Sequence, residues 1–201
     1  MSRRPSFSGS VRNHILVINM IFAATLAGFT QDKGGIETID ATAMGTSTQM
    51  GRNVNIKLRI YRYSSPEERQ ALVDAFRQGQ SEALNKALSK MKSVGRISLP
   101  GTVGYDLAYV REVPTTTGRK IRFVTDRKIA FGEAANTTRS MSYNLTAGEI
   151  DLNDQDKSKS TGVLFPAAQL IINKEGELQM ELYQNPWRLE SIIEWKNKDK
   201  D

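Results

Sequence analysis

Apolar and polar residues alternate over most of this 201-residue chain, and this alternation constrains the fold more than any other feature. From Val54 to Ile60 every second residue is apolar and the residues between are polar. A strand with one buried and one solvated face has this period of two. The alternation returns after Val94 in short runs separated by turn residues such as Pro100-Gly101 and Asn185-Pro186. We therefore expect a succession of antiparallel strands.

One helical segment interrupts the strands. The sequence Ser65-Pro66-Glu67-Glu68 is typical of a helix start, with serine as the N-cap, proline in the first turn and glutamate three residues after the cap. Apolar residues then recur at helical spacing as far as Met91. The pattern predicts a helical segment over 66–91, in which Gly79 either lets the helix lie close to a sheet or divides it in two.

These elements predict an α+β fold. We expect a curled antiparallel sheet of about eight strands with the helical segment 66–91 packed on it, rather than a parallel βαβ fold. A single α+β domain over 54–195 is preceded by a loose segment over 31–53, which holds at most one edge strand at 36–43. A charged tail over 196–201 follows the domain.

Strict alternation also assigns side chains to the two faces of the sheet. We expect four residues of two strands to face the core: Leu107, Tyr109, Leu189 and Trp195. Asp106 and Glu112 should lie on one face of one strand, roughly 20 Å apart at about 3.3 Å per residue. Two carboxyl groups at that separation are too distant to act together in hydrolysis.

The N-terminal segment predicts export. Three arginines precede an apolar run of about 15 residues, Ile15 to Phe29, and this is the order of the n-region and h-region in a secretory signal. The run is short for a transmembrane helix, which needs about 20 residues. We expect residues 1–30 to be a signal peptide cleaved after Ala27 or Thr30, and the alternative is an uncleaved N-terminal anchor. Both place the rest of the chain in the periplasm or the extracellular space.

The chain contains no cysteine, and its one histidine, His14, lies in the predicted signal peptide. A mature chain without imidazole or thiol cannot use Ser-His-Asp or Cys-His catalysis, and it cannot ligate zinc, an iron–sulfur cluster or haem in the usual ways. The sequence also has no phosphate-binding loop or dinucleotide fingerprint. We therefore expect no cofactor. Carboxylate chemistry, oxygen-ligated metals and binding without catalysis stay open.

Basic residues are concentrated in the middle of the chain. Without residues 1–30 the formal net charge falls from +6 to +3, which is too small for a nucleic-acid scaffold, so we expect no nucleic-acid partner. Six of the basic residues fall on one predicted hairpin, which we call the basic hairpin: Arg111, Arg119, Lys120, Arg122, Arg127 and Lys128. This hairpin could attract an anionic envelope component or an acidic patch of another protein. The alternative is a solvated strand face whose charges prevent edge-to-edge pairing.

Trp187 and Arg188 form a second candidate binding site. They follow the turn Asn185-Pro186, and an aromatic side chain beside an arginine at a turn can anchor a partner or stack on a sugar ring. The alternative is that Trp187 closes the end of the core, because an indole buries a large apolar area.

A polar loop, DLNDQDKSKS, contains a candidate calcium site. Its possible ligands are Asp151, Asn153, Asp154 and Asp156. The loop is not an EF-hand, because position six would be Asp156 instead of glycine and position twelve would be Gly162 instead of glutamate. The alternative is a solvated hairpin loop whose acidic residues face water.

Five phrases of the sequence resemble those of small uncharacterised exported bacterial proteins. They are Ser65-Pro66-Glu67-Glu68-Arg69-Gln70-Ala71-Leu72, Met91-Lys92-Ser93-Val94-Gly95-Arg96, Gly104-Tyr105-Asp106, Ser160-Thr161-Gly162-Val163-Leu164 and Tyr183-Gln184-Asn185-Pro186-Trp187. The resemblance spans about residues 49–192. It implies a bacterial source and export, and it carries no assigned activity from which a functional residue could be transferred.

These observations favour an exported, non-enzymatic binding or interaction domain of the bacterial cell envelope, which acts through its basic hairpin or its concave face. One alternative is a small hydrolase that uses Asp and Glu, and another is a structural envelope protein. A basic hairpin without pairing partners would favour binding, whereas two carboxylates that converge in a deep pocket with perturbed pKa values would favour hydrolysis. We expect contact with a membrane only through an uncleaved leader.

N-terminal sequencing of the protein recovered from the periplasm or the medium tests export. Cleavage at the small residues that end the apolar run should give a chain that begins between Gly28 and Asp32. Recovery from the cytosol with Met1 intact would contradict the prediction.

Overall fold

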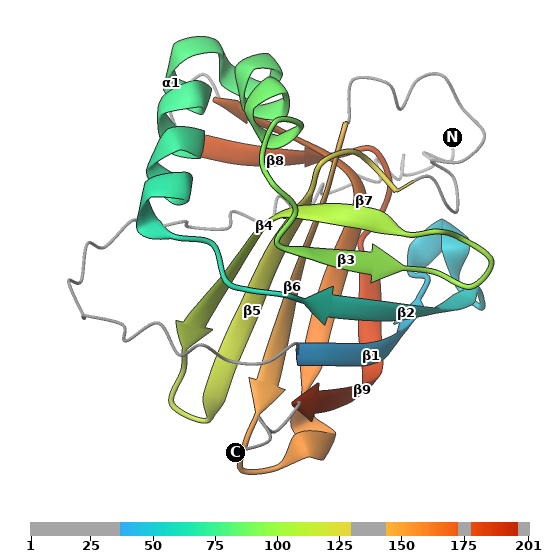
Figure 1. The fold of residues 1–201 in the computed structure, drawn as a ribbon. Coiled ribbons are helices and arrows are strands. Elements are labelled where there is room, and N and C mark those ends of the chain that lie inside the picture. The colour runs from blue at the N-terminus through green and yellow to red at the C-terminus, as the bar shows by residue number, and fades with distance from the viewer. Residues whose placement is uncertain (1–36, 130–143, 173–177, 197–201) are drawn as a thin grey trace, which may run out of the picture.

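The computed structural model describes residues 37–129, 144–172 and 178–196. These residues form one α-helix and a nine-stranded antiparallel sheet that curls until it closes on itself (Figure 1), which confirms the predicted α+β fold. The strands are β1 (Glu37–Met44), β2 (Asn53–Ile60), β3 (Gly95–Ser98), β4 (Tyr105–Pro114), β5 (Gly118–Thr125), β6 (Leu145–Asn153), β7 (Thr161–Ile172), β8 (Leu178–Leu182) and β9 (Trp187–Lys196). The helix is α1 (Pro66–Leu88), and two short 3-10 helices follow β1 and β6: η1 (Ser47–Gln49) and η4 (Lys157–Lys159).

Eight of the described strands form a closed ring. They pair in the order β6-β5-β4-β3-β2-β1-β9-β7, and β7 also pairs with β6, which closes the sheet. Strand β8 lies outside the ring and pairs with the C-terminal part of β7. Apolar side chains that face inward from all around the ring fill its interior, and the largest fully buried ones include Leu58, Ile97, Leu107, Phe123 and Leu164. The main core therefore lies inside the ring.

An extra residue interrupts the pairing of three described strands: β4, β9 and β7, where the register with β6 shifts between Leu145 and Ala147. The first two of these bulges bear on the candidate functional site. In β4 the register with β5 shifts between Leu107 and Tyr109, so Ala108 is the extra residue. In β9 the register with β1 shifts opposite Ala41, and Ser191 at this point has a positive φ of 52°. Figure 1 shows β4 starting beside β3 and ending beside β5, with a different direction. These β-bulges allow one continuous sheet to turn two corners.

The bulge in β4 reverses the faces of the residues that follow it, because the side-chain period of a strand is two. Leu107, before the bulge, is buried in the interior as predicted. Tyr109, after it, packs on the outer face beneath α1, so its predicted inward position is wrong. Glu112 faces inward, whereas Asp106 pairs with Arg96 on the outside, so the two carboxyl groups do not share a face.

The bulge in β9 has the same effect on the end of the chain. Leu189 precedes Ser191 and is buried as predicted. Trp195 follows it and lies on the outer face with 56% of its surface exposed, so its predicted inward position is also wrong. Glu194 faces inward instead.

Strand β1 lies within the sheet rather than at an edge. The sequence predicted a loose segment over 31–53 with an edge strand at 36–43, and the described part of that segment corrects this prediction. Strand β1 pairs with β2 along its whole length and with β9 on its other side. Its inward residues Ile39, Ala41 and Ala43 are buried. Small residues of this segment had suggested that it is loose. Ala41 and Ala43 instead face the interior of the eight-stranded ring, which is narrow and has room for small side chains.

Helix α1 starts as the sequence predicted. The backbone N–H of Glu68 donates to Ser65 Oγ at 3.2 Å, and the backbone N–H of Ser65 donates to the Glu68 carboxylate at 2.9 Å, which completes the capping box. The helix ends at Leu88 instead of Met91, and the non-helical backbone of Gly79 and the residue after it divides α1 into two parts.

Helix α1 covers the outside of one part of the ring. Leu84 and Leu88 pack with Ala108 of β4 and Leu145 of β6 in a second apolar cluster. In Figure 1 the helix lies over β4 and β7, away from β1 and β2. The outer face of β1 and β2 is therefore not covered by α1.

The two predicted segments that flank the domain lie wholly or mostly outside the described residues. These are the predicted signal peptide over 1–30 and residues 197–201 of the predicted tail, whereas Lys196 is the last residue of β9. Within the described ranges, no helix has the length and apolar character to span a bilayer.

Replacement of Ser191 by glycine tests the bulge in β9. A non-glycine residue in the left-handed conformation carries a strain of about 1–2 kcal/mol, whereas glycine adopts it freely at an entropic cost of about 0.5–1 kcal/mol. In a urea titration, Ser191→Gly should raise the free energy of unfolding by up to about 1 kcal/mol. The matched control Ser98→Gly, in the regular strand β3, should lower it by about 0.5–1 kcal/mol. Equal losses in both variants would show that Ser191 is not strained.

Candidate functional site

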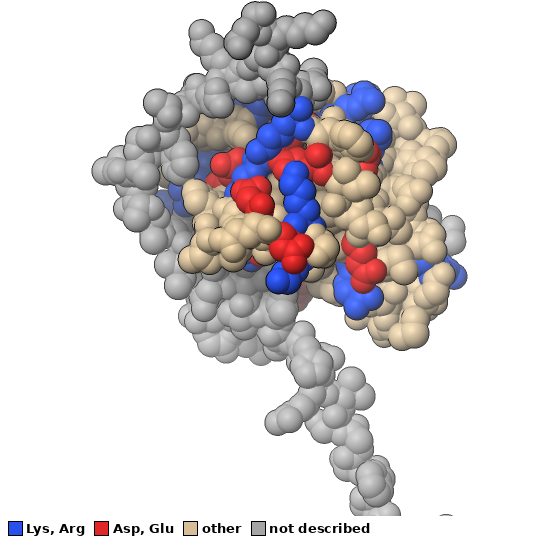
Figure 2. All heavy atoms as spheres, turned by 90° about the horizontal axis from the view of Figure 1, so that it is seen from below, with Lys and Arg blue, Asp and Glu red and all other residues tan. Residues whose placement is uncertain are grey.

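The basic hairpin is formed by β4 and β5, but its charges do not make one exposed basic face. Arg119 points inward and is buried. Lys120 and Arg122 point outward, and both bind Glu149 of β6, with distances of 2.9 Å from Lys120 Nζ and 2.6 Å from Arg122 Nε. Asp151 lies a further 3.5 Å from Lys120 Nζ. Figure 2 shows one face of the molecule, seen from below, on which basic and acidic side chains alternate.

The other three residues of the basic hairpin lie apart from one another. Arg111 lies opposite Arg122 on the outer face of β4. Arg127 follows β5, where its guanidinium carbon is 5.6 Å from the centre of the Tyr105 ring. Lys128 is next to it in the chain and half-buried. The structure therefore spreads the predicted site over the inside of the ring, its outside and the turn after β5.

Trp187 and Arg188 also do not form a joint surface. Trp187 is 2% exposed and belongs to the main core, which favours the alternative that it closes the core. Arg188 points to the other face and pairs with Glu190 at 2.8 Å. Adjacent residues of a strand face opposite sides, so the two side chains cannot bind one partner together.

Three of the four candidate calcium ligands serve other local contacts, and the fourth, Asp154, is exposed. Asn153 Oδ1 accepts hydrogen bonds from the backbone N–H groups of Gln155 and Asp156, at 3.0 and 2.8 Å. Asp156 Oδ1 accepts from Ser158, and Asp151 faces Lys120. In the part of the chain that the structure describes, no group of three or more Asp, Glu, His or Cys residues is placed to hold a metal ion.

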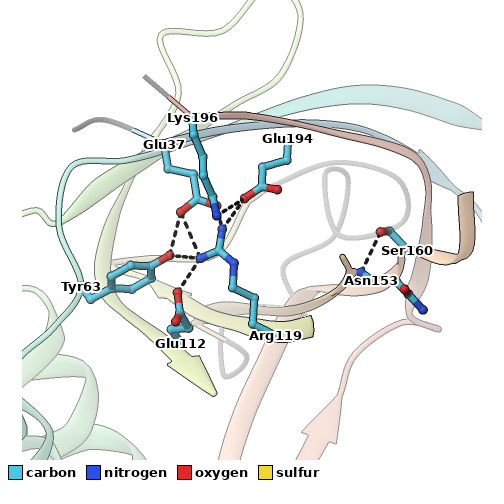
Figure 3. A network of polar contacts seen from close by, with 8 residues as sticks. All are labelled: Glu37, Tyr63, Glu112, Arg119, Asn153, Ser160, Glu194 and Lys196. Carbon is cyan, nitrogen blue, oxygen red and sulfur yellow. Dashed lines mark hydrogen bonds and ion pairs between the residues drawn. The ribbon is translucent and has the colours of Figure 1, made fainter. Parts of the chain in front are cut away.

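The inward side of the hairpin holds a cluster that the sequence did not predict, and we call it the Arg119 cluster (Figure 3). The Arg119 guanidinium binds three carboxylates and one phenol: Glu37 of β1, Glu112 of β4, Glu194 of β9 and Tyr63. Its distances are 2.6 Å to Glu37 Oε1 and 2.7 Å to the Tyr63 hydroxyl. Tyr63 in turn donates to Glu37 Oε2 at 2.7 Å, and Lys196 lies 3.3 Å from Glu194.

The bulges in β4 and β9 explain why these groups meet. Without the extra residue in β4, strict alternation would direct Glu112 outward, and without the one in β9 it would direct Glu194 outward. The inward carboxylates need a cation because an unpaired buried charge is costly. Arg119, near the start of β5, supplies it by reaching across the end of the ring.

The protonation of the cluster follows from burial and the surrounding charges. Burial raises the pKa of Glu37, and Tyr63 and Arg119 oppose this rise without cancelling it. Burial would also raise the pKa of Glu194, but Arg119 and Lys196 outweigh it, so that pKa is lowered. Burial and the neighbouring Glu37 raise the pKa of Tyr63, which therefore keeps its proton at neutral pH.

Carboxyl groups with opposed pKa shifts are one arrangement for acid and base catalysis. Here, however, both point to the same guanidinium, and their side chains are only 9% exposed in Glu37 and 8% exposed in Glu194. A substrate that used both carboxylates would have to displace Arg119, which binds them. The cluster is therefore suited to holding strands together rather than to catalysis.

An open groove lies on the outer face of the ring, on the side that α1 does not cover. Its volume is about 500 Å³, and pockets for small ligands have volumes of roughly 300–1,000 Å³. Strands β1 and β2 form the floor, β9 forms one wall, and β3 with the turn after it forms the other. We call it the outer groove, and its polar lining residues are Asp40, Thr42, Asn55, Lys57, Ser98, Thr102 and Ser191.

Two large apolar side chains are exposed at the β9 side of the outer groove. Ile193 lines the groove and is 50% exposed, and Trp195 follows it on the same face of β9. The Trp195 indole N–H donates to Asp40 Oδ2 at 3.0 Å, while Asp40 Oδ1 lies 3.2 Å from Lys57 Nζ. Asp40 thus connects the indole to the floor of the groove.

One signal for this arrangement was present in the sequence. Ser191 is a polar residue where strict alternation requires an apolar one between Leu189 and Ile193, and two isoleucines stand side by side after it. Such a break is typical of a bulge. The Arg119 cluster had no comparable signal, because its residues are far apart in the sequence.

Comparison with known proteins adds no family to this description: no protein-family profile matches the chain, and no curated protein or solved structure matches it. The resemblance to small exported bacterial proteins therefore stays a prediction.

Replacement of Arg119 by methionine tests the cluster. Removal of the cation leaves three carboxylates facing one another, and we expect Arg119→Met to lower the free energy of unfolding by about 3–5 kcal/mol at pH 7. Without Arg119 the pKa values of Glu37 and Glu194 rise in the folded state. A group whose folded-state pKa is raised stabilises the fold below its unfolded pKa and loses that contribution as the pH rises. The deficit of the variant should therefore shrink as the pH falls from 7 toward the ordinary glutamate pKa of 4.5.

Two controls make this result specific. Arg119→Lys retains the charge and should lose less stability than Arg119→Met at pH 7. Arg77→Met removes an exposed partner of Asp74 and should change the free energy of unfolding by less than about 1 kcal/mol. A deficit of Arg119→Met that is the same at pH 7 and near pH 4.5 would contradict the assigned role of the carboxylates.

Proposed function

We propose that the protein is a non-enzymatic binding protein of the bacterial cell envelope, exported to the periplasm or the extracellular space, and that its partner binds in the outer groove. The basic and apolar order of the N-terminal segment supports export. One observation carries the binding role: Ile193 and Trp195 are exposed beside an open groove. Large apolar side chains exposed beside a concave surface are typical of interaction sites.

The pairing of the basic hairpin argues against it as the main binding surface. Lys120 and Arg122 share the carboxylate of Glu149, so an anionic partner would have to compete with a charge that is already in place. Arg119, the most central cation of the predicted site, is enclosed by three glutamates. The proposal therefore places binding on the outer face of β1, β2, β3 and β9.

The burial of the Arg119 cluster also supports a role without catalysis. Glu37 and Glu194 are the described carboxyl groups whose pKa values are displaced in opposite directions within one cluster. They are the best candidates for the alternative hydrolase, and Arg119 occupies the space between them. The outer groove contains a single carboxylate, that of Asp40, among its lining residues. The lining of the groove therefore lacks the two carboxyl groups that hydrolysis by a paired acid and base requires.

Co-sedimentation with insoluble envelope fragments of the source cells tests the proposal. The exported protein should pellet with the fragments, and Ile193→Asp should reduce the bound fraction about tenfold or more, because a charge replaces an exposed apolar contact. Arg77→Ala, on α1, should bind like the unaltered protein. Equal binding by Ile193→Asp and the unaltered protein would contradict a role for the groove and favour a structural envelope protein.

A further inference from the structure

Most backbone groups on the floor of the outer groove are already paired with neighbouring strands. Strand β1 pairs with β2 and β9, β2 pairs with β1 and β3, and β3 pairs with β2 and β4. Over the paired residues the backbone N–H and C=O groups lie within the sheet ladder, but β2 pairs with β3 only from Lys57 to Ile60, so among the described strands residues 53–56 have a partner on the β1 side alone. Addition of a partner strand needs an open edge, and β2 provides at most these four residues. Recognition along the floor of the groove must therefore come mainly from side chains.

The side chains of the groove are suited to a ligand with many hydroxyl groups. Hydroxyl and amide side chains predominate on its polar lining: Thr42, Asn55, Ser98, Thr102 and Ser191. Such side chains can donate and accept hydrogen bonds, as sugar hydroxyls do. The Thr102 hydroxyl is already engaged with the backbone of Leu99, and Ser98 Oγ donates to the backbone C=O of Lys57 at 3.4 Å. The Thr42 hydroxyl donates to Asn55 Oδ1 at 3.1 Å. This contact does not use the two N–H groups of the Asn55 amide, which can donate to a ligand.

The charges of the groove favour an uncharged ligand. Asp40 and Lys57 are its charged lining residues, and they neutralise each other across 3.2 Å. An anionic ligand would have to compete with Asp40 for Lys57, and a cationic one would have to compete with Lys57 for Asp40. A neutral ligand can instead hydrogen-bond to both without breaking the pair.

Trp195 gives the groove an aromatic surface with a fixed orientation. Its hydrogen bond to Asp40 uses the polar edge of the indole and leaves the ring exposed. An aromatic ring of this kind stacks on the C–H face of a sugar while neighbouring polar groups bind the hydroxyls. Asp40, which lines the groove and also binds Trp195, brings these two kinds of contact together.

We propose that the outer groove binds an uncharged glycan chain, with one sugar ring stacked on Trp195 and the hydroxyls of the chain bound by Asp40, Asn55 and Lys57. This inference rests on the proposed function, because it names the class of partner for the same groove. It differs from that function in excluding a protein partner.

Fluorescence quenching provides a direct test, because the chain has two tryptophans and Trp187 is buried. Quenching by acrylamide should report mainly on Trp195. Soluble neutral hexasaccharides of β-linked glucose, α-linked glucose and β-linked N-acetylglucosamine are added at millimolar concentration to the full chain. At least one should protect Trp195 from acrylamide, and calorimetry should give its affinity.

Three variants assign the effect to the groove. Trp195→Ala should weaken the affinity for that hexasaccharide about tenfold or more, whereas Trp195→Phe, which retains an aromatic face, should weaken it less. Asp40→Ala should also weaken it, because the indole and Lys57 both lose their partner. Arg77→Ala should bind like the unaltered protein. Urea titration of each variant shows whether the fold is retained.

The outcomes separate this inference from the proposed function. Protection of Trp195 by a hexasaccharide whose affinity, measured by calorimetry, falls about tenfold or more in Trp195→Ala supports the inference. Failure of all three hexasaccharides, or binding that Trp195→Ala leaves unchanged, overturns it. If the hexasaccharides fail but Ile193→Asp still abolishes co-sedimentation with the envelope fragments, the partner is not a neutral glycan and the proposed function stands.

Discussion

The ion pairs of Arg119 hold the closed sheet together at the end where backbone pairing is incomplete. Strands β7 and β9 pair over three residues of each, and Leu189 is the last residue of β9 in that pairing. Beyond it, β9 continues beside β1. Arg119 crosses this end of the ring from β5 to Glu194 of β9 and Glu37 of β1. One side chain thus joins strands that the sheet ladder leaves unconnected.

Both faces of β9 depend on a single extra residue. Because Ser191 is added in the bulge, Glu194 turns inward to Arg119, and Ile193 and Trp195 turn outward to the groove. The buried cluster and the exposed groove are therefore two results of one change in register. The outer side chains that border the groove thus belong to a strand segment whose inward residue Glu194 is bound by Arg119.

Local patterns were sufficient to predict the elements, but not the faces of every strand. The capping box at Ser65 and the alternation from Val54 depend on neighbouring residues, so the helix start and most strands could be predicted. The position of a bulge depends on the pairing with the partner strand. Ala108 is small enough to face either side of the sheet, so its place in a bulge could not be predicted from the sequence. Arg119 was expected on an exposed hairpin, since its main partners, Glu37 and Glu194, lie far away in the sequence. Arg119 could be identified as a candidate from its charge, but residue spacing could not show that three glutamates surround its guanidinium.

Hydrogen exchange of the segment 190–196 measures most directly whether Arg119 holds the end of β9 in place. In the unaltered protein, the amides that pair with β1 should exchange slowly. In Arg119→Met, we predict much faster exchange in 190–196 and little change where residues 121–124 of β5 pair with β6. Unchanged protection of 190–196 in a variant that still folds would contradict the central role given to Arg119.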